Sequence, residues 1–131
     1  MAPFKANSSE ARKIMSFIKD GFTPHFDELQ EVFRSHPKWQ RMKELGTELW
    51  LDTGDPAEIE SLWTREFSAV TTNNSLLNKE VQKGTYDELI PRARKLLREL
   101  ADLTTKQERL ELAFILNARH ALSLVERFDA F

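Results

Sequence analysis

Two short polar segments carry the residue types that could do chemistry in this chain. Asp52 ends one apolar run, and a Thr-Thr-Asn-Asn-Ser segment, residues 71–75, ends another. A carboxylate beside amide and hydroxyl groups can orient a polyol or relay a proton. The same residue types also settle at strand ends and turns through backbone hydrogen bonds alone. On spacing alone both interpretations stay open.

The segments that position these residues are predicted to form a strand, a helix and a second strand. Residues 48–53 and 67–72 are short apolar runs typical of buried strands. Between them, residues 55–58 (DPAE) open a helix with an aspartate cap and a proline at its first position. So short a connection through a helix requires a parallel pair, whose carboxyl ends share one edge. Asp52 and Asn73 are therefore expected at the same end of a sheet.

The rest of the chain is predicted to be helical. Before the first strand, helices are expected to begin at the Asn7 cap, at the Thr23 cap and at Pro37, the third ending at Gly46. After the second strand, the pattern predicts a short helix over 75–80, a helix that settles only after Pro91, and a long helix over 105–127. The long helix is expected to open with the capping box of residues 105–108 (TKQE) and to carry the apolar stripe Leu110, Ala113, Phe114, Ala121, Leu124, Val125 and Phe128.

The predicted fold class is mainly α with one strand–helix–strand unit of two short parallel strands, and an all-α bundle is the alternative. Residues 1–46 are expected to form a helical N-terminal extension, and residues 47–131 a partial β/α segment, together one compact unit. Three tryptophans, Trp39, Trp50 and Trp63, are expected to anchor the core.

Composition narrows the classes of partner and compartment. The net charge of −2 offers no positive field for nucleic acid or for an anionic membrane surface. Cysteine is absent, which fits a reducing compartment, so the cytoplasm is expected. No cofactor and no metal site are expected, because His25, His36 and His120 lack ligand spacing. His120 is interpreted as a partly buried structural histidine.

Taken together, the two polar segments resemble the opening of the transaldolase family. Residues 49–55 (LWLDTGD) resemble its first strand, which ends Asp-Thr, and residues 69–77 (AVTTNNSLL) resemble the Thr-Thr-Asn-Pro phrase that follows its first helix. Asn74 departs from the pattern, since it stands where the family has proline. The resemblance implies the first part of a (β/α)8 barrel that transfers dihydroxyacetone units between sugar phosphates through a lysine Schiff base. By the same resemblance, Asp52 would assist proton transfer, and Thr72 and Asn73 would contact the substrate.

Two functions are predicted from this sequence. The first is a transaldolase-like protein of pentose phosphate metabolism, inactive alone because the 131 residues end where the third strand would begin. The family's third-strand glutamate and fourth-strand lysine then have no counterpart, and a sugar phosphate would bind only weakly. The alternative is a non-catalytic helical interaction module. Expected partners are a second copy in a homodimer, or a chain that completes the sheet.

Overall fold

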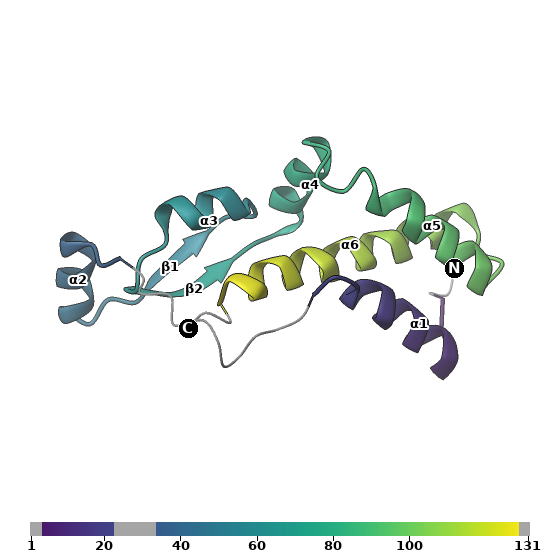
Figure 1. Cartoon of the computed structure of the whole chain (residues 1–131), viewed down its shortest axis with the longest axis horizontal. Coiled ribbons are helices and arrows are strands. Elements are labelled where there is room, and N and C mark those ends of the chain that lie inside the picture. Colours follow the sequence, from purple (N-terminus) through teal and green to yellow (C-terminus); the bar gives the residue numbers. More distant parts are fainter. Residues whose placement is uncertain (1–3, 23–33, 129–131) are drawn as a thin grey trace.

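The computed structural model describes residues 4–22 and 34–128, with residues 126–128 described by their backbone alone. These ranges contain six helices and two strands (Figure 1). In chain order the elements are α1 (Ser8–Lys19), α2 (Pro37–Glu44), β1 (Leu49–Asp52), α3 (Pro56–Leu62), β2 (Phe67–Thr71), α4 (Asn74–Gln82), α5 (Leu89–Leu100) and α6 (Thr105–Phe128). The helix predicted from Thr23 lies outside the described residues.

The strands form a parallel two-stranded sheet, so the mainly-α fold with one strand–helix–strand unit is confirmed and the all-α bundle is excluded. Trp50 pairs with Ala69 and Asp52 with Thr71, after an irregularity in the register next to Leu49. Asp55 caps α3 by accepting a hydrogen bond from the Ala57 N–H at 2.9 Å, as its position before proline predicts.

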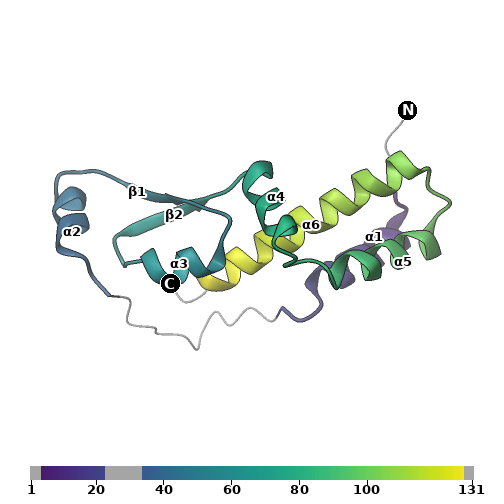
Figure 2. The same ribbon diagram turned by 90° about the horizontal axis from the view of Figure 1, so that it is seen from above.

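The molecule is elongated, and α6 runs between its two ends (Figures 1 and 2). At one end, α1 and α5 pack against α6; we call these three helices the helical half. At the other end, β1, β2 and α3 form the sheet half, with α2 beyond them (Figure 2). The two described helices of the N-terminal 46 residues, α1 and α2, thus lie at opposite ends.

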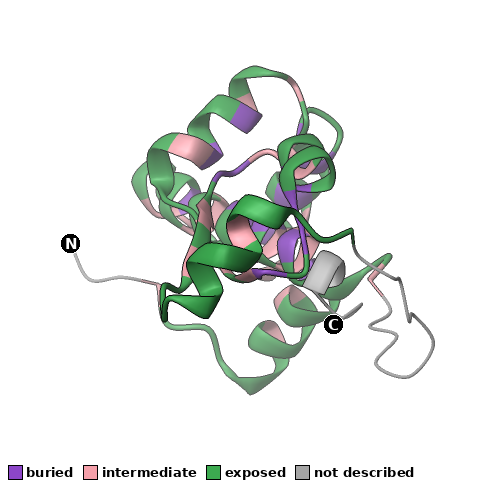
Figure 3. Ribbon diagram, turned by 90° about the vertical axis from the view of Figure 1, so that its left-hand side faces the viewer, coloured by how far each residue is buried: buried purple, intermediate pink, exposed green. Residues whose placement is uncertain are grey.

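The helical half has a closed apolar core. Ala93 and Leu97 on α5 and Ile115 on α6 are almost wholly buried, and Ile18 of α1 completes the cluster. Figure 3 shows buried positions where helices face one another and exposed positions on the outside. The Arg119 guanidinium fixes the end of α1, because it donates hydrogen bonds to the carbonyls of Ile18, at 2.8 Å, and of Asp20.

In the described residues of the sheet half, the apolar cluster lies on one face of the sheet. Ile59 and Trp63 of α3 pack with Leu124 of α6, and the partly buried Leu51, Phe67 and Val70 pack against them. On the other face Trp50 is 60% exposed. The expectation that Trp50 anchors the core is therefore wrong: the alternation of a strand places it on the face opposite α3. Trp63 is buried and Trp39 half-buried.

Two helix starts differ from the prediction. α5 begins at Leu89 rather than after Pro91, because a proline in the first turn removes an N–H that needs no partner within the helix. α6 is capped by Thr104, one residue earlier than predicted: its hydroxyl oxygen accepts from the Gln107 N–H at 3.3 Å, and the Gln107 side chain accepts from the Thr104 N–H at 3.1 Å.

The residues of the predicted apolar stripe of α6 differ in burial, because other elements cover only part of the helix. Leu110 and Phe114 are exposed, but Leu124 is buried against α3 and belongs to the core. Val125 is exposed. The Phe128 side chain lies outside the described part of the chain.

Candidate functional site

The carboxyl ends of the two strands bring the predicted polar residues together. The Thr71 hydroxyl donates a hydrogen bond of 2.9 Å to the Asp52 carboxylate across the strand pair. The backbone N–H of Thr53 donates to the Thr71 carbonyl at 3.0 Å and extends the ladder by one residue. Asp52 and Asn73 thus follow the same edge of a parallel pair, as the crossover predicts. Thr72 is exposed beside them.

Asn73 serves the backbone rather than an open site. Its side-chain oxygen accepts hydrogen bonds from the N–H groups of Ser75, at 2.9 Å, and Leu76, at 3.1 Å. It is therefore the N-cap of α4, and its side-chain oxygen is engaged. Asn74 is the first helical residue, the position that most readily accepts proline, so the helix begins at the same place with asparagine there.

Hydrogen bonds of the Thr53 side chain stabilise the loop between β1 and α3. Thr53 is buried, and its hydroxyl donates to the Glu58 carboxylate while accepting from the Asp55 N–H at 3.1 Å. Gly54 lies against α4 and α6: a methyl group built there would lie 3.0 Å from the Leu76 Cβ and 3.3 Å from the His120 Nε2. Small size at Gly54 therefore lets α6 approach the end of the sheet.

A polar cluster behind this loop was not anticipated as a unit; it consists of Asp55, Glu80, Lys83, Tyr86 and His120. The Lys83 ammonium donates to Asp55 at 2.7 Å and to the buried Glu80 at 2.6 Å, which joins the start of α3 to the end of α4. The two hydrogen bonds raise the pKa of Lys83. The bond between Lys83 and Asp55 also lowers the pKa of Asp55. Lys83 is accordingly a fixed cation.

His120 and Tyr86 form the buried end of this cluster. The Tyr86 hydroxyl lies 2.7 Å from the His120 Nδ1, and His120 is 2% exposed. Burial lowers the pKa of His120, while the charge of Glu80 opposes that effect. Burial also raises the pKa of Tyr86. Within the described residues His120 Nε2 has no hydrogen-bond partner. His120 is thus buried more deeply than the sequence predicted.

The chemistry open to these groups is limited by their protonation and exposure. A Schiff-base lysine must be neutral, and Lys83, paired with two carboxylates, is held in the charged form. Lys79, the lysine nearest in sequence to Asn73, is exposed. Among the residues that the structure describes, no three His, Asp or Glu side chains are placed to hold a metal ion.

Two further carboxylates are buried in structural positions. Glu66 accepts hydrogen bonds from the Ser35 hydroxyl and, at 3.2 Å, from the His36 N–H, which ties the chain before α2 to the start of β2. Burial opposes ionisation of Glu66, yet these hydrogen bonds outweigh it and lower its pKa to about 2. Glu108 joins α6 to α5 through two arginines. None of these pairings follows from spacing, since the partners lie up to 31 residues apart.

No protein-family model, curated protein or solved structure matches this chain. The transaldolase resemblance consequently stays a prediction. In the described part of the chain no helix combines the length and the apolar character that crossing a bilayer requires.

Proposed function

We propose that this chain is a non-catalytic interaction module that pairs with a second copy of itself through the free edge of β1. The observation that carries the proposal is that β1 has a neighbour on one side only, within the described residues, while Trp50 beside that edge is 60% exposed. An unpaired strand edge presents a row of N–H and C=O groups that another strand can join.

The free backbone groups of β1 can be assigned from its ladder. In a parallel pair, alternate residues direct their N–H and C=O groups toward the neighbouring strand. Because the Thr53 N–H donates to Thr71, the N–H and C=O groups of Trp50 and Asp52 lie on the opposite, outer edge. β2 is the less accessible strand, since four of its five residues are half-buried.

The charges on β1 restrict the register of a symmetric pair. Two copies related by a two-fold axis would pair their β1 strands antiparallel. A register centred on Trp50 places Glu48 of one copy opposite Asp52 of the other, and directly opposed like charges destabilise a sheet. A register centred on Leu51 avoids this clash and sets Trp50 against Asp52. We therefore propose the Leu51-centred register.

Hydrogen exchange of the β1 amides tests this proposal on the full chain. Self-pairing should slow the exchange of the Trp50 and Asp52 amides as the concentration rises from about 1 to about 200 μM, a range that brackets weak dimers. The Thr53 amide is the internal control, because it is already bonded to Thr71 in one copy. Exchange at Trp50 and Asp52 that stays fast and independent of concentration would contradict the proposal.

A second candidate concerns the carboxyl end of the sheet. The hydrogen bond between Thr71 and Asp52 favours it, since it sets a hydroxyl beside a carboxylate where the transaldolase resemblance expects contacts to substrate. We infer weak binding of a sugar phosphate, without turnover, in a cytoplasmic protein. Fructose 6-phosphate followed by borohydride reduction should leave the intact mass of the chain unchanged. A stoichiometric adduct on any lysine would overturn the non-catalytic assignment.

A further inference from the structure

The basic face of α5 carries a pair of arginines that a single carboxylate holds in place. Arg94 Nε donates to the Glu108 carboxylate at 2.6 Å, and Arg98 donates to it through Nε at 2.9 Å and through one terminal nitrogen at 3.3 Å. The Arg98 and Arg94 contacts lower the pKa of Glu108 to about 2, so the carboxylate stays ionised near neutral pH. Both guanidinium groups are therefore fixed by one anchor on α6.

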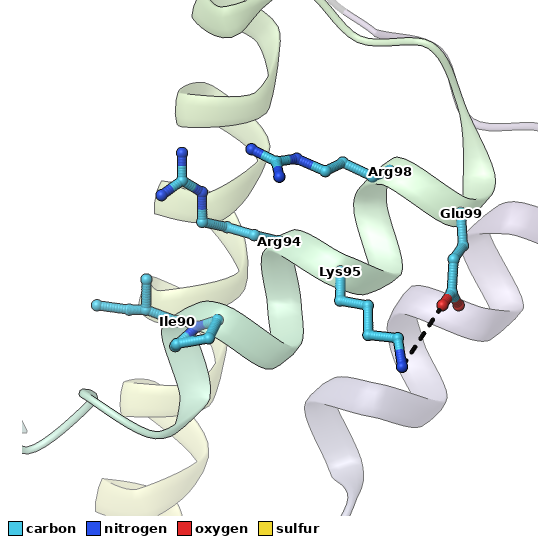
Figure 4. A pocket seen from close by; sticks show the side chains of 6 residues that line it. Ile90, Arg94, Lys95, Arg98 and Glu99 are labelled. Atoms are coloured by element: carbon cyan, nitrogen blue, oxygen red, sulfur yellow. Dashed lines mark ion pairs between the residues drawn. The ribbon is translucent and has the colours of Figure 1, made fainter.

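Glu108 does not use every hydrogen-bond donor of the two guanidinium groups. Glu108 occupies both Nε–H groups and one terminal nitrogen of Arg98. Both terminal nitrogens of Arg94 and one of Arg98 have no partner within the described residues, and the two side chains are 47% and 65% exposed. Figure 4 shows the two guanidinium groups side by side, reaching from successive turns of α5 in the same direction.

The surface around the pair is shaped as two adjoining grooves. One, of about 430 Å³, is lined by Ile90, Pro91, Arg94, Lys95, Arg98 and Glu99. The other, of about 450 Å³, shares both arginines and extends to Asp102 and Glu108. The charges in the first groove sum to +2, from three basic and one acidic side chain, while those in the second cancel. The first groove is thus the one that favours an anion.

We propose that Arg94 and Arg98 form a binding site for a phosphate monoester in the groove beside Ile90 and Pro91. Planar guanidinium groups donate paired hydrogen bonds to phosphate oxygens, and a prior carboxylate contact reduces the ordering that binding requires. Three basic side chains, less Glu99 and the Glu108 carboxylate that both arginines contact, leave a net charge of +1, which attracts the dianion. Its organic substituent would lie over the apolar surface of Ile90 and Pro91. The site lies on the helical half, apart from Asp52 and from the β1 edge.

Nitrogen–proton correlation spectra of the full chain, titrated with phenyl phosphate at pH 7.5, test the site. The Arg94 and Arg98 side-chain signals should shift and saturate, and phenyl phosphate should bind more tightly than inorganic phosphate because of its apolar group. Sodium chloride at matched ionic strength should not reproduce the shifts. Shifts that never saturate, or that chloride reproduces, would show general screening and overturn the proposal.

Matched variants separate this site from general charge effects. Arg98→Gln should weaken the affinity for phenyl phosphate by about tenfold, since it removes charge-assisted donors. Arg109→Gln makes the same charge change at an exposed α6 position outside both grooves, and should leave the affinity within about twofold. Equal weakening in both variants would contradict the site. If Arg98→Gln fails to fold, Arg98→Lys keeps the charge beside Glu108 and should still bind more weakly.

Discussion

In the helical half, Leu97 and Ile115 are each 1% exposed, whereas in the sheet half Trp50 is 60% exposed on a strand of four residues. The difference follows from how each element is covered. Each of α1, α5 and α6 meets the other two, so their apolar sides close on one another. The sheet has α3 and α6 on one face and its other face exposed at Trp50. One chain therefore combines a completed core with a sheet that has room for another strand.

Truncating the core of each half should produce the largest difference in stability. Leu97→Ala should lower the free energy of unfolding by about 2–5 kcal/mol, because it removes a fully buried side chain and leaves a cavity. Trp50→Ala should lower it by less than about 1 kcal/mol at a concentration where the chain is monomeric, since its side chain is mostly in water. Urea unfolding followed by circular dichroism measures both. A loss at Trp50 equal to that at Leu97 would mean that the sheet face is covered within one copy.

A substitution at Gly54, where the end of the sheet meets α4 and α6, should have the next largest effect on stability. Gly54→Ala should cost about 1–3 kcal/mol, because the added methyl group would press on Leu76 and His120. Gly46→Ala is the matched control: nothing lies within 4 Å of an added methyl group there, and only the backbone angle of +85° opposes it.

Imidazole proton signals of His120 distinguish the two glycine variants. They should move in Gly54→Ala and stay in place in Gly46→Ala, even though both proteins lose stability. An unchanged His120 signal in Gly54→Ala would show that α6 does not depend on this close approach.

Lowering the pH should reduce the stability of the chain by less than these substitutions do. Burial lowers the pKa of His120 below its ordinary value of 6.5, so the folded chain keeps the neutral ring while the unfolded chain takes up a proton. The contribution of His120 to stability should be complete well above pH 6.5 and should be lost progressively as the pH drops below 6.5. His120→Gln should flatten this decline in urea midpoints. The pKa values of Glu66 and Glu108 are lowered from an ordinary 4.5 to about 2, so the stability that these carboxylates contribute is lost only as the pH falls from about 4.5 toward 2.

The elements were predictable where local signals determine them. The Asn7 and Asp55 caps and the short crossover fix α1, α3 and the parallel strands through nearby residues. Long-range contacts decide the remainder. The apolar pattern that predicts β1 does not determine which face of the sheet α3 covers, so it does not predict the exposure of Trp50. Leu124 joined the core because α6 reaches α3, which no periodicity within α6 reveals.

The candidate site was predictable only in outline. A parallel crossover places Asp52 and Asn73 at one edge, but whether Asn73 faces a ligand or caps a helix depends on where α4 begins. The Lys83 bridge links residues 28 apart, and the Tyr86–His120 pair residues 34 apart. The arginine pair on α5 had a helical spacing of four residues, a signal that could have been found by looking for basic residues one turn apart.

Light scattering coupled to gel filtration tests the central claim most directly. At about 100 μM, a concentration that populates micromolar dimers, the chain should elute with a mass near twice 15.3 kDa. Trp50→Asp should return it to 15.3 kDa, because the register centred on Leu51 would then set this carboxylate directly opposite Asp52 of the other copy, while Leu62→Asp, which introduces the same charge at an exposed α3 residue, should stay dimeric. A wild-type mass of 15.3 kDa at this concentration would contradict pairing through β1.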